Sequence, residues 1–355
     1  MASNLNSVDQ TPTLAVVDGE GIGPSIVSAA LEVLTAATEV TGTTIAIDRM
    51  PELAERDQYG LVVGFSAQAE YNRVFASVFP VLHGPAGGRF VYQLRDQFDL
   101  SVKQTPIVPW PELADASIVD PRRAKGVDIL VVRDNAGGLY QGDFGADSDS
   151  AVHSARYTEA QVSHVISAAV QAAEQRNHRL TVVTKPGGVP TISRLWRDVA
   201  EQIVPSTIEL DFCEIDNACF QVLADPKRFD VIATPNMFGD VLGDTATALL
   251  GSRGMAYSVN RSESGRAVYQ TAHGAAHDLT GKDVANPSAQ ILTLAWLVRD
   301  SLGLSKVADA MVAGLRAEIG RGVRTPDIAG ENSMVVGTTR FTERVCDAIR
   351  AGDGA

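Results

Sequence analysis

Cysteine is scarce in this chain, and its spacing excludes two common structural roles. The three cysteines, Cys213, Cys219 and Cys346, are odd in number and include no CxxC pair. A disulfide framework needs paired cysteines, and structural zinc sites usually take them from closely spaced pairs. Neither is predicted, and the three are expected to be small core residues.

Basic residues are in the minority. Lysine and arginine number 30 against 43 aspartates and glutamates, which gives a formal net charge of −13, and no basic run is present. Nucleic-acid binders need a basic face. DNA and RNA are therefore not expected partners.

Long apolar runs are missing as well. No stretch approaches the roughly 18 apolar residues of a membrane span, and residues 1–12 lack the basic and apolar regions of a secretory signal. We therefore expect no membrane partner and a cytoplasmic location. With 45% hydrophobic residues over 355 positions, the chain can bury the core of one large or two ordinary domains.

Strand-like and helix-like runs alternate along the chain. Strands are expected over 13–17, 44–47, 128–132, 180–184, 208–215 and 231–234. Helices are expected over 26–37, 159–176, 193–202, 218–223, 305–319 and 339–350, and after Gly239 and Pro287. This alternation predicts an α/β fold. Segments 115–126 and 142–154 are polar and irregular, and the second is a candidate exposed arm.

A glycine-rich turn follows the first expected strand. It reads DGEGIGP from Asp18 to Pro24, and Asp48 ends the second strand about where a Rossmann fold places its ribose-binding acid. The glycines, however, give GxGxG rather than GxGxxG, and Pro24 lacks the N–H that a helix start offers to pyrophosphate. A Rossmann fold is therefore not predicted. On these residues alone, a tight strand-to-helix turn and a ligand-binding loop stay equally open.

Two acids follow the expected strand at 231–234. Asp240 and Asp244 are four residues apart, so a helix places both carboxylates on one face, where they repel each other unless a cation lies between them. Mg²⁺, a hard ion that takes oxygen ligands, suits such a pair. The alternative is two acids of the first helical turn that complement the helix dipole.

Five spaced segments together resemble the isocitrate and isopropylmalate dehydrogenases, a family of β-decarboxylating dehydrogenases. In chain order they are GEGIGP from Gly19, LRDQFDL from Leu94, VVRDNAGGLYQG from Val131, NMFGDVLGD from Asn236 and HGAAHDLTGKDVANP from His273. The order is consistent over residues 14–344, and the resemblance is weakest over 51–80.

The resemblance implies the two-domain α/β fold of that family. Residues 1–99 and 251–355 would form a large cofactor-binding domain, and residues 100–250 a smaller substrate and dimerisation domain with a possible arm at 142–154. It also implies NAD-linked oxidation and decarboxylation of a 3-substituted malate, with Mg²⁺ or Mn²⁺, in a homodimer with shared active sites. The family also contains non-catalytic regulatory subunits, but this chain retains the residues that catalysis needs.

The resemblance assigns metal and catalytic roles. Asp240 and Asp244 would bind the metal together with Asp216 of the neighbouring subunit. Tyr140 would protonate C3 of the enolate, and Lys185 would help to accept the proton of the 2-hydroxyl group. Without the surrounding motifs, Tyr140 would be interpreted as a half-buried aromatic residue and Lys185 as a solvated one.

Substrate-binding residues follow from the same segments. Arg95 and Arg133 would bind substrate carboxylates, while Thr105 replaces a second family arginine and Lys103 could supply the missing charge. Arg89 stands where an anionic C3 substituent would be bound, as in isocitrate or 2-phosphonomethylmalate, although a solvated loop arginine is the alternative. Isopropylmalate, homoisocitrate and tartrate remain alternative substrates.

The last segment resembles the adenosine-binding loop of the family. An acid at Asp278 would accept hydrogen bonds from the ribose and repel a 2′-phosphate, which favours NAD over NADP. Gly187 replaces a family asparagine that helps to hold nicotinamide or substrate. The alternative for the loop is a glycine-rich surface turn capped before a helix. The expected cofactor-binding residues are His273, Gly274, Ala275, Ala276, Asp278, Leu279 and Asn286.

Overall fold

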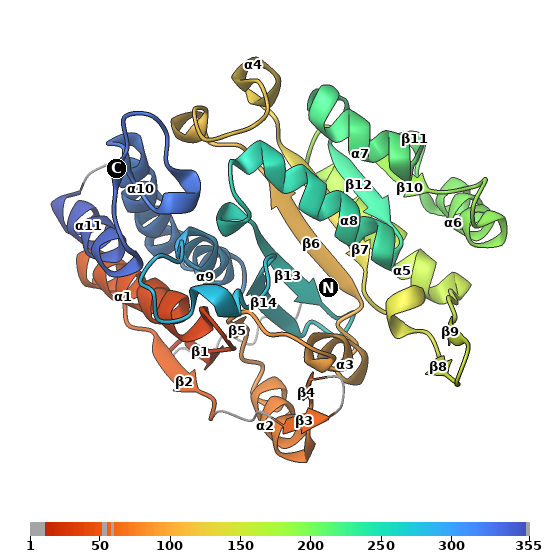
Figure 1. Ribbon diagram of the computed structural model, residues 1–355, viewed down its shortest axis with the longest axis horizontal. Helices are drawn as coiled ribbons and strands as arrows, with labels where there is room; N and C mark the ends of the chain where they lie inside the picture. The colour runs from red at the N-terminus through yellow and green to blue at the C-terminus, as the bar shows by residue number, and fades with distance from the viewer. Residues whose placement is uncertain (1–10, 52–54, 58–59, 353–355) are drawn as a thin grey trace.

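The computed structural model describes residues 11–51, 55–57 and 60–352 (Figure 1). Residues 1–10, in which the sequence predicts no targeting signal, lie outside this part. The described residues form a ten-stranded sheet in the order β11-β10-β12-β7-β6-β13-β14-β5-β1-β2. Its strands are β1 (Thr13–Val17), β2 (Ala46–Arg49), β5 (Val81–His83), β6 (Val102–Ile107), β7 (Ile129–Asp134), β10 (Arg179–Thr184), β11 (Glu209–Glu214), β12 (Val231–Thr234), β13 (Tyr257–Arg261) and β14 (Ala267–Thr271).

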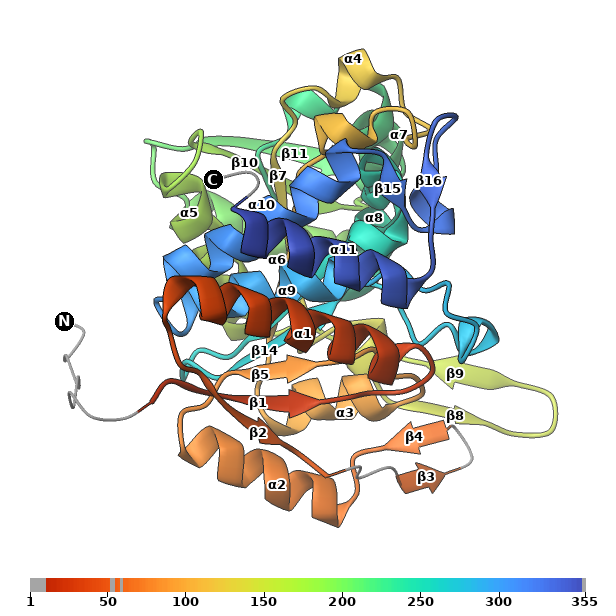
Figure 2. The ribbon, with the colours of Figure 1, turned by 90° about the vertical axis from the view of Figure 1, so that its left-hand side faces the viewer.

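Helices cover both faces of this sheet. They are α1 (Gly23–Thr41), α2 (Phe65–Ala76), α3 (Phe90–Gln97), α4 (Pro121–Ala124), α5 (Glu159–Glu174), α6 (Pro190–Ile203), α7 (Ile215–Ala224), α8 (Asn236–Ala246), α9 (Ser288–Asp300), α10 (Ser305–Gly320) and α11 (Thr338–Ala351). In Figure 2, α1, α9, α10 and α11 lie on one side of β1 and β5, and α2 lies on the other. Helix α3 packs in the same apolar core as α2. The α/β prediction is confirmed.

The strand residues alternate between two cores because successive side chains point to opposite faces. In β1, Leu14 and Val16 pack with α1, whereas Ala15 packs with α2 and α3. The same alternation in β7 sends Val131 toward α7 and α8, and Val132 toward α5 and α6. The core therefore consists of apolar layers on both faces of the sheet.

The sheet mixes parallel and antiparallel strands. β13 is antiparallel to both β6 and β14, and β6 is antiparallel to β7, while β2, β1, β5 and β14 run parallel. This mixture agrees with the prediction that the fold is not a Rossmann fold. The sheet runs without interruption through both proposed domains, so the division at residues 99 and 251 stays a prediction.

After β1 and after β5, the chain turns to opposite faces of the sheet. α1 follows β1 toward one core, and α3 follows β5 toward the other. In open α/β sheets, such a switch point forms a crevice at the carboxyl ends of the strands, and ligands bind there. Residues 18–24 and 84–89, which follow β1 and β5, border this crevice.

Segment 142–154 is a hairpin, so the expectation of an irregular chain was wrong. β8 (Phe144–Ala146) and β9 (Ala151–His153) pair antiparallel, with all their residues exposed. In Figure 2 the hairpin projects from the body as an arm. The remaining short pairs are β3 (Glu55–Asp57) with β4 (Gly60–Val62) and β15 (Val323–Arg324) with β16 (Met334–Val335).

Two expectations from composition can be compared with the structure. Cys213 and Cys346 are buried, Cys219 is half-buried, and all three are free thiols, as expected for core residues. Within the described ranges, none of the helices combines the length and apolarity that crossing a bilayer requires.

Candidate active site

Three basic side chains are buried close to where β6 and β7 meet α3. Arg95, Lys103 and Arg133 are each less than a tenth exposed, and the pairing of β6 with β7 sets Lys103 opposite Arg133. Burial, followed by repulsion from Arg133, lowers the pKa of Arg95 and lowers that of Lys103 to about 7. Buried cations are unfavourable unless an anion accompanies them. This cation cluster is therefore suited to binding carboxylates, and its role in binding those of the substrate stays a prediction.

Arg133 links the cluster to α8. Its Nε and Nη2 donate to Asn236 Oδ1 at 3.1 and 2.7 Å, and its Nη1 donates to Asp240 Oδ1. Gly239 allows this approach, since a Cβ there would lie 2.8 Å from Arg133 Cγ. The Tyr140 hydroxyl donates to the other Asp240 oxygen at 3.1 Å. Three of the expected residues, Arg133, Tyr140 and Asp240, thus form one group.

Tyr140 is in the protonation state that a proton donor needs. Burial, with the nearby negative charge of Asp240, raises the pKa of its hydroxyl to about 12. The hydroxyl therefore stays protonated at neutral pH, and it can donate a proton to a carbanion-like carbon held beside it.

Arg89 lies next to Tyr140 rather than in open solvent. Its Nη1 donates to the Tyr140 carbonyl oxygen at 3.1 Å, and its guanidinium carbon lies 5.2 Å from the ring centre of Tyr92 and 5.3 Å from that of Phe144 in the arm. The Tyr92 ring also lies 5.6 Å from the Arg95 guanidinium and 5.3 Å from the Tyr140 ring. Tyr92 was not among the residues expected from the sequence, although its position three residues before Arg95 on a helix could have indicated it.

The expected metal ligands do not meet within one chain. Asp240 pairs with Arg133, Asp244 pairs with Arg253 at 2.9 Å, and the described residues contain no group of three His, Cys, Asp or Glu that could hold a metal. The inference that Asp240 and Asp244 need a cation to offset their repulsion is corrected, because each has an arginine partner. The donor set still fits Mg²⁺ or Mn²⁺, since both carboxylates are about half exposed on one helix and supply hard oxygen ligands.

Asp216 lies at the start of α7, and its side chain contacts Lys185, which follows β10. Lys185 Nζ is 2.8 Å from Asp216 Oδ1 and 2.6 Å from Glu214 Oε2, and these hydrogen bonds raise the pKa of the lysine. The side chain of Asp216 is 69% exposed, so it is accessible to a second chain. Lys185 and Asp216 therefore belong to the same half of any shared site, which the sequence analysis did not foresee.

The expected adenosine loop lies between β14 and α9. His273 Nδ1 donates to the Gly274 carbonyl at 3.0 Å, and burial lowers the pKa of the ring. Its Nε2 is buried and has no hydrogen-bond partner among the described residues, so it can accept a hydrogen bond from a ligand. Asp278 is exposed on the loop. A buried orphan acceptor and an exposed carboxylate fit the adenine amino group and the ribose hydroxyls.

Other residues of this loop form hydrogen bonds and apolar contacts with neighbouring parts of the chain. Ala275 accepts a hydrogen bond from the Ile22 N–H at 2.9 Å, and Ala276 and Leu279 pack against the start of α1. Asn286 caps α9 by accepting from the Ser288 N–H at 2.9 Å, which agrees with the alternative of a helix cap. Its amide nitrogen donates to Asp327, so both ends of the Asn286 side chain are already bonded.

Comparison with known proteins agrees with this architecture. Residues 13–345 match the family described as isocitrate/isopropylmalate dehydrogenase. The 3-isopropylmalate dehydrogenase of Methylococcus capsulatus is 32% identical, with 96% of this chain and 99% of the relative covered, and that of Geobacillus kaustophilus is 33% identical, with 95% of each covered. The crystal structure of isocitrate dehydrogenase from Methylococcus capsulatus superimposes with a TM-score of 0.80 at 26% identity, over 96% of this chain and all of that chain. The chain belongs to the isocitrate/isopropylmalate dehydrogenase family.

Proposed function

We propose that this chain oxidises and decarboxylates a 3-substituted malate whose C3 substituent is anionic, such as isocitrate or 2-phosphonomethylmalate. Family membership makes the chain a β-decarboxylating dehydrogenase that uses NAD with Mg²⁺ or Mn²⁺. The substituent and the roles of individual residues are the proposed part. The buried cluster of Arg95, Lys103 and Arg133 supports the malate core, and the position of Arg89 beside Tyr140 is the observation that carries the anionic substituent.

The side chains of this site have complementary tasks. Arg95, Lys103 and Arg133 hold the two carboxylates of the malate core. Bound NAD would supply the hydride acceptor for C2, and a metal ion held by Asp240 and Asp244 would supply a Lewis acid for the C2 oxygen. Tyr140 donates its proton to C3 after CO₂ has left. Lys185 takes up the hydroxyl proton, for which its contacts with Asp216 and Glu214 must loosen, because both raise its pKa.

Arg89 supports an anionic substituent. One of its N–H groups donates to the Tyr140 carbonyl. The other N–H donors of the planar guanidinium group have the geometry that suits a carboxylate or phosphonate. An isopropyl group at this point would leave the remaining N–H donors of Arg89 without an acceptor. Isopropylmalate is the second candidate because the two curated relatives above carry that activity in their names. Homoisocitrate and tartrate remain further alternatives.

The substituent can be tested at Arg89. Arg89→Met should lower kcat/KM for isocitrate or 2-phosphonomethylmalate by about 10- to 100-fold, since a charge-assisted hydrogen bond is lost, and should leave isopropylmalate nearly unchanged. The check is a panel of 3-substituted malates assayed with both proteins. The proposal fails if isopropylmalate is the best wild-type substrate, or if the substitution lowers kcat/KM for every substrate alike.

The lowered pKa of Lys103 predicts how kcat/KM depends on pH. Burial places its pKa at about 7, so the lysine is a cation below that pH and loses its charge as the pH rises through it. Since kcat/KM reports the free enzyme, kcat/KM should fall above pH 7. Lys103→Arg keeps the charge and should remove this fall. Superimposable pH profiles for the two proteins would exclude Lys103 as the titrating group.

We also propose a homodimer with shared sites. Asp240 and Asp244 on α8 lack a third ligand within the described part of the chain, and Asp216 is exposed on the adjacent helix α7. Apolar side chains are exposed on the same two helices, with Phe220 at 66% and Val241 at 52%. Burying these faces against a second copy would be favourable, and it would bring acids of two chains toward each other.

A further inference from the structure

Arg253 pairs with Asp244, one of the two proposed metal ligands on α8. It is the first residue of η5 (Arg253–Met255), a short 3₁₀ helix that precedes β13. Its Nη2 lies 2.9 Å from Asp244 Oδ2, and its side chain is 58% exposed. The mechanism proposed above gives this arginine no task.

The two metal acids have arginine partners of different kinds. Arg133, the partner of Asp240, is only 4% exposed and also donates twice to Asn236. Arg253 instead reaches Asp244 from the surface of the protein. An ion pair at the surface is weak, because water solvates both of its charges. Arg133 is therefore held in place by its surroundings, whereas the side chain of Arg253 can leave its partner.

The main chain around Arg253 is held on both sides. The Ala272 N–H, directly after β14, donates to the Ala256 carbonyl at 2.9 Å. On the other side of η5, the Ser252 hydroxyl donates to Asp327 and also accepts the N–H that follows Arg253. A change at the end of the Arg253 side chain should therefore leave the main chain in place.

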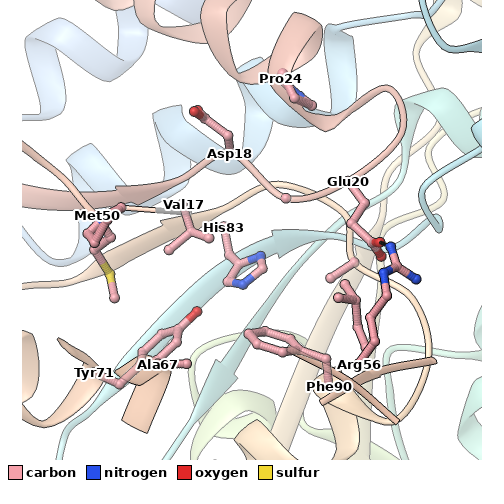
Figure 3. Close-up of a pocket in the computed structure, with 14 residues that line it drawn as sticks. Val17, Asp18, Glu20, Pro24, Met50, Arg56, Ala67, Tyr71, His83 and Phe90 are labelled. Atoms are coloured by element: carbon pink, nitrogen blue, oxygen red, sulfur yellow. Dashed lines mark hydrogen bonds and ion pairs between the residues drawn. The ribbon is translucent and has the colours of Figure 1, made fainter. Parts of the chain in front are cut away.

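Two other acids at the carboxyl edge of the sheet also have exposed arginine partners. Asp18 pairs with Arg49 and Glu20 pairs with Arg56, each at 2.7 Å. Figure 3 shows both acids in the turn after β1, at a cavity of about 200 Å³, with Arg56 beside Glu20. Arg49 is 52% exposed, close to the value for Arg253, but its partner Asp18 is not a proposed metal ligand. The pair of Asp18 and Arg49 is therefore a matched control.

A divalent ion bound by Asp240 and Asp244 would lie near the Arg253 guanidinium, because that group contacts an oxygen of Asp244. The two positive charges would repel each other, and salt screens charges at such short range only in part. The ion must therefore displace Arg253 from Asp244. Part of the binding energy of the ion is lost in this exchange.

We propose that Arg253 competes with the divalent metal ion for Asp244 and thereby lowers the affinity of this chain for Mg²⁺ or Mn²⁺. This inference rests on the proposed metal role of Asp240 and Asp244. In the empty site Arg253 neutralises Asp244, and its side chain turns into the solvent when the ion binds. Arg253 thus sets the metal concentration at which the site fills.

Binding of Mn²⁺ to the purified protein, without NAD or substrate, tests this proposal. The electron paramagnetic resonance signal of free Mn²⁺ gives the Kd directly. Arg253→Met removes the charge and keeps an unbranched side chain, so it should bind Mn²⁺ about fivefold more tightly than the wild type. Arg253→Lys keeps the charge and should stay within about twofold of the wild type. Arg49→Met should bind Mn²⁺ as the wild type does, and added salt should reduce the effect of Arg253→Met.

The outcomes separate this proposal from the metal site itself. If Arg253→Met binds Mn²⁺ with wild-type affinity or more weakly, the competition is excluded and the metal site still stands. Equal tightening in Arg49→Met would indicate an effect of net charge and would also exclude a local competition. If Arg253→Met does not fold, Arg253→Gln decides by the same criteria.

A further variant tests the ligand on which the proposal rests. Asp244→Asn should weaken Mn²⁺ binding by about tenfold or more, since it removes a carboxylate ligand. Unchanged affinity in Asp244→Asn, or a wild type that does not bind Mn²⁺, would overturn the metal role of Asp244 and the role of Arg253 with it.

Discussion

Co-expression of equal amounts of Asp216→Asn and Asp240→Asn chains should restore activity that neither variant has alone. Each homodimer carries its lesion in both sites. In a mixed dimer of the proposed kind, one site combines the intact Asp240 of one chain with the intact Asp216 of the other. If chains pair at random, half of the dimers are mixed and each has one complete site, so about a quarter of wild-type activity is expected.

The matched control pairs Asp216→Asn with Lys185→Ala. Lys185 Nζ is 2.8 Å from Asp216 Oδ1, so both changes damage the same half of the site. Every site of every dimer then contains one of the two lesions, and no activity should return. Purification with two different tags would identify the mixed dimers. If purified mixed dimers of Asp216→Asn and Asp240→Asn have no activity, the shared site is excluded. Activity in the mixed dimers of the control pair would exclude it as well.

Tyr140→Phe should reduce steady-state turnover by roughly 10²- to 10⁴-fold, the usual contribution of a positioned acid. The variant keeps the ring that packs on Tyr92 and removes only the hydroxyl that donates to Asp240. In the proposed mechanism, the substrate is oxidised at C2 before C3 takes up this proton. Rapid mixing should therefore show about one NADH per site in a burst, followed by slow turnover.

A neighbouring tyrosine supplies the control for this prediction. Tyr92→Phe removes a hydroxyl from the ring 5.3 Å away, and turnover should change little. The thermal midpoints of both variants show whether either change affects folding. If Tyr140→Phe turns over within tenfold of wild type, or slows the first turnover as much as later ones, Tyr140 is not the proton donor.

Most helices and strands could be predicted because they depend on local patterns. Strand 231–234 was expected with the bounds that β12 has. α1 is longer than the expected 26–37, because Pro24 is tolerated in the first turn and Gly42 ends the helix in a left-handed conformation with φ of 63°. The hairpin of 142–154 was missed, since its strands are three residues long and fully exposed and so show no apolar alternation.

Site residues could be predicted where they belong to a sequence motif. Contacts between segments far apart in the chain could not be predicted. Arg133, Tyr140 and Asp240 were singled out from two separate motifs, and the structure places them in contact. Phe144, which lies beside the Arg89 guanidinium, was missed because it lies in an exposed arm far along the chain from Arg89. The arginine partners of Asp240 and Asp244 also depend on tertiary packing, so their effect on the carboxylate pair could not be read from spacing.

The central claim is that this chain couples oxidation of a 3-substituted malate to loss of CO₂. The most direct measurement follows NADH and CO₂ together while the protein acts on isocitrate, 2-phosphonomethylmalate, isopropylmalate, homoisocitrate and tartrate, with and without Mg²⁺ or Mn²⁺. The account predicts one CO₂ per NADH on at least one of the substrates with an anionic C3 substituent, and loss of both products after exhaustive chelation. Absence of NADH with every substrate, or full activity in the chelated protein, would contradict it.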